Sequence, residues 1–246
     1  MTDEIVQVPP YGQPVAVPPR DWMRRWESDD FRRNGMLSVG TGLLRAQGAV
    51  ARDLAGGCSL NTYIAGCGLL MLGAAMLYGA ILGSTQGLVL QAALKFPVVI
   101  VGACGTCLPS FFVFQALMGA RLSLKQALAA VLMLGAAAGL ILLGCAPIMW
   151  FFSVSTSGDA DIFLGVMNGL ILAFSTLFGF HFLSRTHRYL KWKHDQRLFD
   201  GRVLALWGVL LVLVAAQMAS FIGPLDADRG LFETERGFFL QALFEV

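Results

Sequence analysis

The chain has 246 residues, of which 56% are hydrophobic and only 14% are charged, and its mean hydropathy is +0.66. This composition is too apolar for an ordinary soluble domain, so lipid must form part of the solvent of the folded protein. The small net charge of +2 gives no sign of nucleic-acid binding. A removable signal peptide would place an apolar core directly after a basic start, whereas residues 1–34 are polar and charged, so we expect the N-terminus to be retained.

The first 60 residues precede any long apolar stretch and divide into two parts. Residues 1–20 hold five prolines between positions 9 and 19, which predicts a disordered tail. Residues 21–60 alternate apolar side chains with arginines, as in an amphipathic juxtamembrane segment. Two interpretations stay open: a docking surface for lipid or a partner, or a solvated helix whose arginines only set topology. The arginines expected to contact lipid headgroups are Arg24, Arg25, Arg32 and Arg33.

Five apolar stretches without Asp, Glu, Lys or Arg follow, each long enough to cross a hydrocarbon core of about 30 Å as a helix. Lipid requires every backbone group to be bonded within the chain, and the alternating pattern of a membrane barrel is absent, so these stretches are predicted to be helices. The predicted fold class is all-α, a polytopic transmembrane bundle over residues 61–224 followed by an extracytoplasmic amphipathic tail at 225–246. The predicted spans cover residues 61–83, 96–119, 126–152, 162–184 and 203–224.

The positions of Lys and Arg between these stretches predict how the chain is oriented. With five spans, the N-terminus and the second and fourth loops share one side, and these segments hold 15 of the 18 basic residues. The positive-inside rule assigns that side to the cytoplasm, so the N-terminus is expected inside and the C-terminus outside. In the basic fourth loop, Arg188, Lys191 and Lys193 are expected to contact anionic headgroups.

Uncharged polar residues are the main chemical feature inside the spans. Ion-coupled transport usually needs an ionisable side chain near mid-membrane, and the stretches offer only His181, near the end of the fourth. A channel or carrier for an uncharged solute could use polar groups and a kinked helix instead. Hydrogen bonding between helices is the competing role for the same residues. The pore-lining candidates are Pro109, which should kink the second span, Gln115, Asn168 and Gln217.

Cys104 and Cys107 form a CxxC motif inside the second stretch. A membrane thiol oxidoreductase could place such a pair beside a quinone. Buried cysteine is more often a small apolar packing residue, however, and no His or acid lies nearby in the sequence to activate the thiol. The sequence therefore offers no catalytic candidates apart from these two, and both are weak. The cysteine spacing predicts no metal site, and no motif predicts a cofactor.

Glycines recur at helical spacing in the third and fourth stretches. Gly135 with Gly139 and Gly165 with Gly169 are GxxxG pairs. Such pairs let two helix backbones approach closely in lipid. We expect both pairs to pack helices within one chain rather than to form a dimer.

Three segments of the chain resemble a group of uncharacterised bacterial multi-pass inner-membrane proteins. Residues 95–123 carry an FP pair, then PS among aromatic residues, then the pattern LxGxRLS, and residues 146–156 and 216–233 fit the same group. In topology the group is similar to the Yip-type five-helix membrane family, whose eukaryotic members are linked to vesicle traffic. The resemblance implies five spans in a bacterial inner membrane. It supplies no catalytic residues, because similarity of fold does not confer function.

These observations predict a non-enzymatic structural or assembly subunit of a larger membrane complex. Its expected partners are membrane lipids, especially anionic headgroups on the cytoplasmic face, and other membrane subunits. The apolar segment at 237–244 either folds onto the outer mouth of its own bundle or docks a partner. A channel or carrier for an uncharged small solute is the alternative, and a thiol redox protein is the second alternative.

Overall fold

The computed structural model describes residues 38–57, 59–84, 87–117, 123–155, 161–194 and 201–222. Within these ranges every regular element is a helix, which confirms the all-α fold class. The predicted tails at 1–20 and 225–246 lie outside the described residues. The helices are α2 (Ser38–Arg45), α3 (Gln47–Gly56), α4 (Leu60–Ser84), α5 (Val89–Leu117), α6 (Leu124–Ser155), α7 (Asp161–His194) and α8 (Gly201–Ile222).

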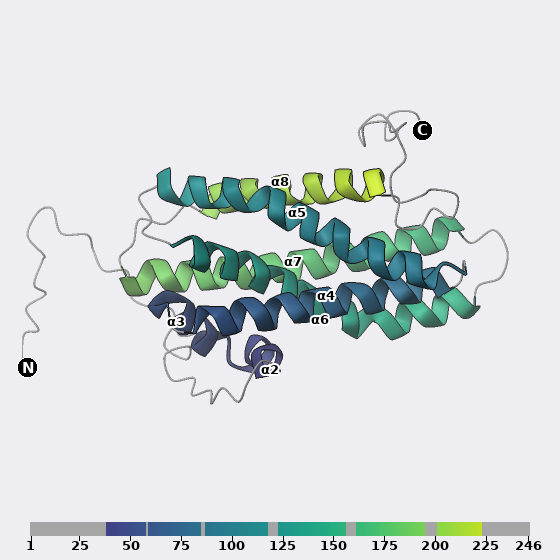
Figure 1. Cartoon of the computed structure of the whole chain (residues 1–246), viewed down its shortest axis with the longest axis horizontal. Coiled ribbons are helices and arrows are strands. Elements are labelled where there is room, and N and C mark those ends of the chain that lie inside the picture. Colours follow the sequence, from purple (N-terminus) through teal and green to yellow (C-terminus); the bar gives the residue numbers. More distant parts are fainter. Residues whose placement is uncertain are drawn as a thin grey trace, which may run out of the picture.

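Helices α4 to α8 are long and apolar enough to cross a membrane, which confirms the predicted five-span bundle. Consecutive spans run in opposite directions along the long axis of the molecule (Figure 1). One end of the bundle, which we call the capped end, is where α2 and α3 lie. At the other end, which we call the far end, α5 and α7 begin while α4, α6 and α8 finish.

Helix α6 forms the centre of the bundle, with 56% of its most apolar window buried, against 22% for α7 and α8. It packs against α4, α5 and α7, and also against α2 and α3. A side chain at Gly135 would collide with Met71 of α4, and one at Gly139 would lie 3.0 Å from the Cβ of Ala74. The first GxxxG pair therefore packs α6 against α4 within the chain, as expected.

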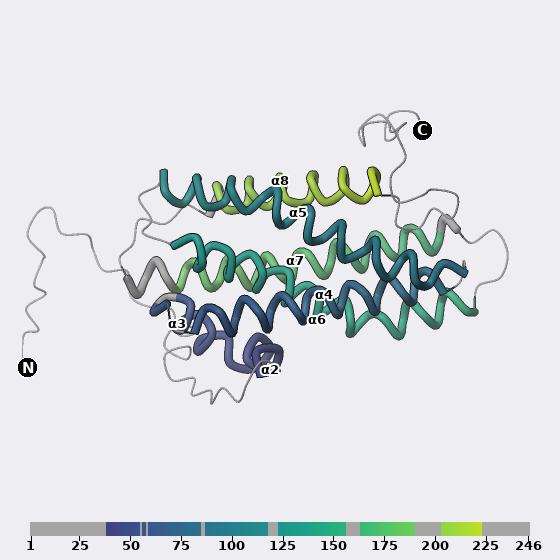
Figure 2. Tube along the Cα trace, viewed as in Figure 1, coloured from purple at the N-terminus to yellow at the C-terminus, as the bar shows by residue number. Residues whose placement is uncertain are grey.

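Helix α5 begins at Val89, seven positions before the predicted start of the second span. The residues from 89 to 94 are apolar except for Gln91 and form helix readily, whereas the prediction ended the span at the nearest charged residue. Lys95 and Pro97 consequently lie inside the helix rather than at its edge. The helix changes direction along its length (Figure 2). Pro109 accounts for a kink, because it has no N–H to donate to the preceding turn.

Helix α7 continues to His194, through the beginning of the predicted fourth loop. Thr186 and Tyr189 on this extension are buried, while Arg188 is exposed and its Nε donates to the Ser184 carbonyl oxygen at 3.3 Å. The basic segment thus begins on a helix of which one side is covered by protein. His181, one turn earlier, is exposed.

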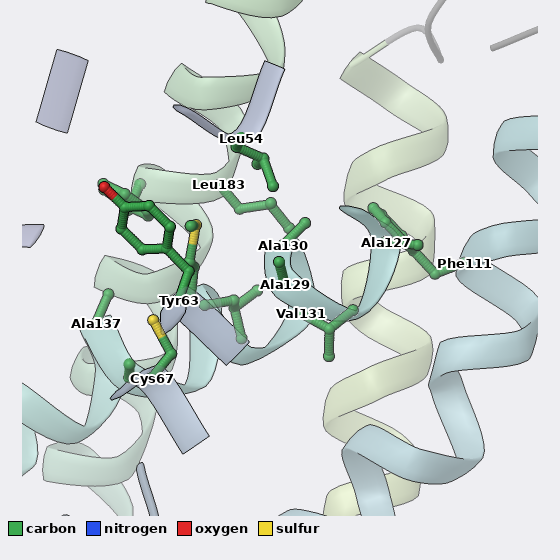
Figure 3. Close-up of a cluster of buried hydrophobic side chains, with 14 of the residues drawn as sticks. Leu54, Tyr63, Cys67, Phe111, Ala127, Ala129, Ala130, Val131, Ala137 and Leu183 are labelled. Carbon is green, nitrogen blue, oxygen red and sulfur yellow. The ribbon is translucent and has the colours of Figure 1, made fainter. Parts of the chain in front are cut away.

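The short helices α2 and α3 cover the capped end with their apolar sides. Val39, Leu43, Val50 and Leu54 belong to one buried cluster with residues of α4, α6 and α7. Figure 3 shows Leu54 beside Leu183, with residues of α6 nearby. The apolar side of residues 38–54 is therefore covered by the bundle itself, an arrangement that neither interpretation of the juxtamembrane segment anticipated.

Polar contacts fasten α3 to the spans. The Tyr63 phenol of α4 donates to Oδ2 of Asp53 at 2.7 Å, and Gln126 Nε2 of α6 donates to the Leu54 carbonyl oxygen at 3.0 Å. Gln126 also forms a capping box with Ser123, which starts α6: its N–H donates to Ser123 Oγ, and its Oε1 accepts from the Ser123 N–H. Gln126 therefore both stabilises the first turn of α6 and binds α3 to the bundle.

Candidate functional site

A lysine inside the far half of the bundle is the most unusual chemical feature of the described residues. Lys95 has none of its surface exposed, and it shares the buried side of α5 with Ala92 and Val99. Ionisable residues inside membrane spans are costly to bury and commonly mark functional sites. Lys95 is therefore the residue from which we build the candidate site.

Tight packing of α4 against α5 fixes the position of Lys95. A Cβ added to Gly79 would lie 2.5 Å from the Ala92 carbonyl oxygen, and one added to Gly83 would lie 2.7 Å from the Leu88 carbonyl oxygen. The two glycines form a GxxxG pair that brings the α4 backbone onto the first turns of α5. The backbones of α4 and α5 are therefore in close contact on the turns that lead to Lys95.

A second polar contact lies at the same level of the bundle. The Tyr78 phenol donates to Oδ1 of Asn168 at 2.9 Å, linking α4 to α7. The ring of Tyr78 packs edge-on against Phe96, with 5.7 Å between the ring centroids. Since Phe96 follows Lys95 directly, the backbone of Lys95 lies at the level of this contact, and we call this level of the bundle the far polar layer.

The far polar layer combines a fully buried lysine with a hydrogen bond between the Tyr78 and Asn168 side chains. Within the described residues, no group of three or more His, Cys, Asp or Glu side chains is placed to hold a metal ion. The interaction that is evident in this layer is hydrogen bonding between α4 and α7.

The four pore-lining candidates do not meet at one place. Asn168 lies in the far polar layer, whereas Gln115 is buried nineteen positions beyond Phe96, roughly 28 Å along α5 at 1.5 Å per residue. Pro109 is exposed on the outside of α5, and Gln217 is half-buried on α8. The Oε1 atom of Gln115 has no hydrogen-bond partner in the described structure. A continuous path for an uncharged solute is not formed by these four residues alone.

The CxxC residues lie on α5 where α8 packs against it. Cys107 is buried, Cys104 is half-buried, and both carry free thiols. The Trp207 indole of α8 donates to the Cys107 carbonyl oxygen and to Ser110 Oγ, each at 3.2 Å, and its ring packs against Phe111. These contacts are those of a packing interface between two helices.

The predicted headgroup-binding residues fall at or beyond the edge of the described structure. Arg188 is exposed at the capped end. Lys191 and Lys193 lie in the last turns of α7, with side chains outside the described set, and Arg24, Arg25, Arg32 and Arg33 precede the described residues.

Sequence reasoning missed two features of this site. It counted Lys95 as a loop charge, although the stretch before it is apolar except for Gln91 and free of turn residues from Leu88 on, which is the signal that the helix starts earlier. It also passed over the pair Gly79 and Gly83, whose GxxxG spacing is visible in the sequence.

Comparisons with models of protein families, with curated proteins and with solved structures gave no match.

Proposed function

We propose that the chain is a non-enzymatic subunit of a larger membrane complex, in which the outer side of α7 receives a transmembrane helix of another subunit. The observation that carries this proposal is the contrast between the two GxxxG pairs. Gly135 and Gly139 pack α6 against α4 inside the chain. Gly165 and Gly169 are exposed, and a Cβ added to either would meet nothing within 4 Å.

The outer side of α7 suits a helix partner better than lipid alone. Ala173 continues the small-residue line by one more turn, and it is exposed as well. Large apolar side chains flank that line, with Val166, Leu170 and Leu177 each more than half exposed. Small residues bordered by large apolar ones allow close helix approach in lipid, where hydrophobicity alone gives no preference for protein contact.

The proposed location is a bacterial inner membrane, with the capped end in the cytoplasm. The distribution of Lys and Arg supports this orientation, because the basic residues of the described chain other than Lys95 belong to the capped end. Anionic lipid headgroups are the proposed neighbours of exposed Arg188. Reporter fusions after Gly158 and at the C-terminus test the orientation, since both should report an extracytoplasmic position. A cytoplasmic signal from either fusion contradicts it.

Purification of the intact chain in native lipid discs tests the partner proposal, with co-purifying proteins and lipids identified. The informative variants are Gly165→Ile and Gly169→Ile, which place a bulky side chain on the proposed contact without a clash inside the chain. The matched control is Gly144→Ile on α6, where the glycine is also exposed and has open space around it.

We expect the α7 variants to reduce recovery of the partner by about tenfold, the equivalent of roughly 1.4 kcal/mol. The Gly144→Ile control should retain the partner at the unmodified level. A lone monomer from the unmodified chain would overturn the proposal. Equal recovery from the α7 variants and the control would show that another surface makes the contact.

A further inference from the structure

His181 is an ionisable side chain on the outside of the bundle. It lies within Phe163–Tyr189, the part of α7 that is long and apolar enough to cross a membrane. Its side chain is exposed, and among the described residues it has no hydrogen-bond or ion-pair partner. Ionisable residues in membrane spans normally face the interior of a bundle and pair with polar groups there. The outward position of His181 is therefore unusual for a residue in a span.

The contact between α7 and α8 shows how deep His181 lies. The preceding residue, Phe180, packs against Trp207 of α8, with 6.1 Å between the ring centroids. The apolar span of α8 begins at Val203, which at 1.5 Å per residue is about 6 Å nearer the capped end than Trp207. The span of α7 ends at Tyr189, about 12 Å beyond His181 in the same direction. His181 thus lies at least one helical turn inside the apolar spans.

His181 also lies on the line of residues that we propose to receive a helix. The residues that precede it at intervals of four are all exposed, namely Gly165, Gly169, Ala173 and Leu177. Residues four apart form a ridge along one side of a helix, and helices commonly pack along such ridges. A helix that follows this ridge meets the small residues in the far half of the bundle and meets His181 nearer the capped end.

The imidazole of His181 requires a hydrogen-bond acceptor. It carries at least one N–H donor in either protonation state. Lipid tails offer no acceptor, and Arg185 and Arg188 on the next two turns of α7 are donors only. The side chains of Asp, Glu, Asn and Gln provide oxygen acceptors, and such groups form hydrogen bonds between helices in lipid. A helix seated on the ridge is therefore the source of the acceptor.

We propose that the helix received by α7 carries an Asp, Glu, Asn or Gln side chain whose oxygen accepts a hydrogen bond from His181. This inference rests on the proposed function and adds the chemistry of the partner. The small residues allow close approach of any helix with a suitable surface. His181 selects among such helices, because a wholly apolar one would enclose the imidazole without an acceptor.

Recovery of the partner from native lipid discs tests the role of His181. The variant His181→Leu removes the donor and keeps an apolar side chain, whereas His181→Asn keeps a donor. The matched control is Thr106→Val on α5. Thr106 is also an exposed polar residue of a span, but its hydroxyl donates to the Gly102 carbonyl oxygen of its own helix at 2.8 Å.

We expect His181→Leu to reduce recovery of the partner about threefold to tenfold, the range for a hydrogen bond between helices in lipid. His181→Asn should restore most of the recovery, and the Thr106→Val control should match the unmodified chain. Full recovery from His181→Leu together with reduced recovery from Gly165→Ile overturns this inference and leaves the proposed function in place. Absence of a partner from the unmodified chain overturns both.

A photoreactive amino acid at Leu177 identifies the partner while it leaves His181 intact. Leu177 is exposed one turn before His181 on the same ridge, and Val113, exposed on α5, is the control position. We expect a link from Leu177 to a transmembrane helix of another protein, with Asp, Glu, Asn or Gln within about two helical turns of the linked residue. A link to a helix without such a residue overturns the proposal. So does a link only to lipid, to a second copy of this chain or to another part of the same chain.

Discussion

The Tyr63 phenol reaches from the first span to the Asp53 carboxylate of α3 over 2.7 Å. Tyr63 is buried, and Asp53 is half-buried at the boundary between cap and bundle. The bond is accompanied by the contact from Gln126 to Leu54, so two spans hold α3. Cap and bundle should therefore unfold together.

Replacing Tyr63 with Phe keeps the ring in the buried cluster and removes the donor. We expect a loss of about 1 to 3 kcal/mol, because the bond involves a charged acceptor. Thermal unfolding in detergent measures this loss of stability. Asp53→Asn is the companion variant, and the double variant should lose less than the sum of the two single losses. Fully additive losses would show that the two side chains are not coupled.

The turn between α3 and α4 depends on Gly57. Its φ of 67° is left-handed, and its N–H bonds the carbonyl oxygens of Asp53 and Leu54 to end α3. A Cβ at this position would meet nothing within 4 Å, so any effect of Gly57→Ala comes from backbone strain alone. We expect a loss of about 1 kcal/mol in thermal stability. Gly73→Ala, at an open helical position, is the control and should not destabilise the protein.

Close packing of α4 on α5 makes Gly79 and Gly83 intolerant of side chains. Gly79→Val or Gly83→Val would drive a methyl group into the α5 backbone, and we expect a loss of about 2 kcal/mol or more, in the range for overpacking. Gly73→Val on the same helix has open space and serves as the control. Equal stability of all three variants in a detergent melt would contradict the described helix contact.

The thiols of Cys104 and Cys107 should not be needed for redox chemistry. Replacing both with Ala should leave the cellular phenotype unchanged and lower stability modestly, because Cys107 is buried. Thiol labelling of the unmodified protein should give the same result with and without reductant. A labelling increase after reduction, or a lost phenotype in the double variant, would revive the redox interpretation.

The spans could be predicted because lipid imposes one strong requirement on sequence, a long uncharged run. The prediction of the second span failed at a charged residue, because the span was taken to begin after Lys95. Lys95 lies inside α5, and Gly79 and Gly83 bring the α4 backbone onto the turns just before it, a contact between two helices that the search for uncharged runs did not consider.

The cap could not be predicted for a similar reason. Val39, Leu43 and Leu54 give an amphipathic pattern that fits a membrane surface and a protein surface equally well. Their actual neighbours, among them Ala130 and Leu183, are far away in sequence. The same limit applies to the glycines, since Gly139 and Gly169 have the same spacing motif and opposite surroundings.

The distance in sequence between Leu54 and Leu183 has a consequence for synthesis. The cap is made first, yet its binding surface is complete only after α7 has emerged from the ribosome. Closing of the cap is therefore a late step of biogenesis, and it reports that four spans have been inserted in the correct order.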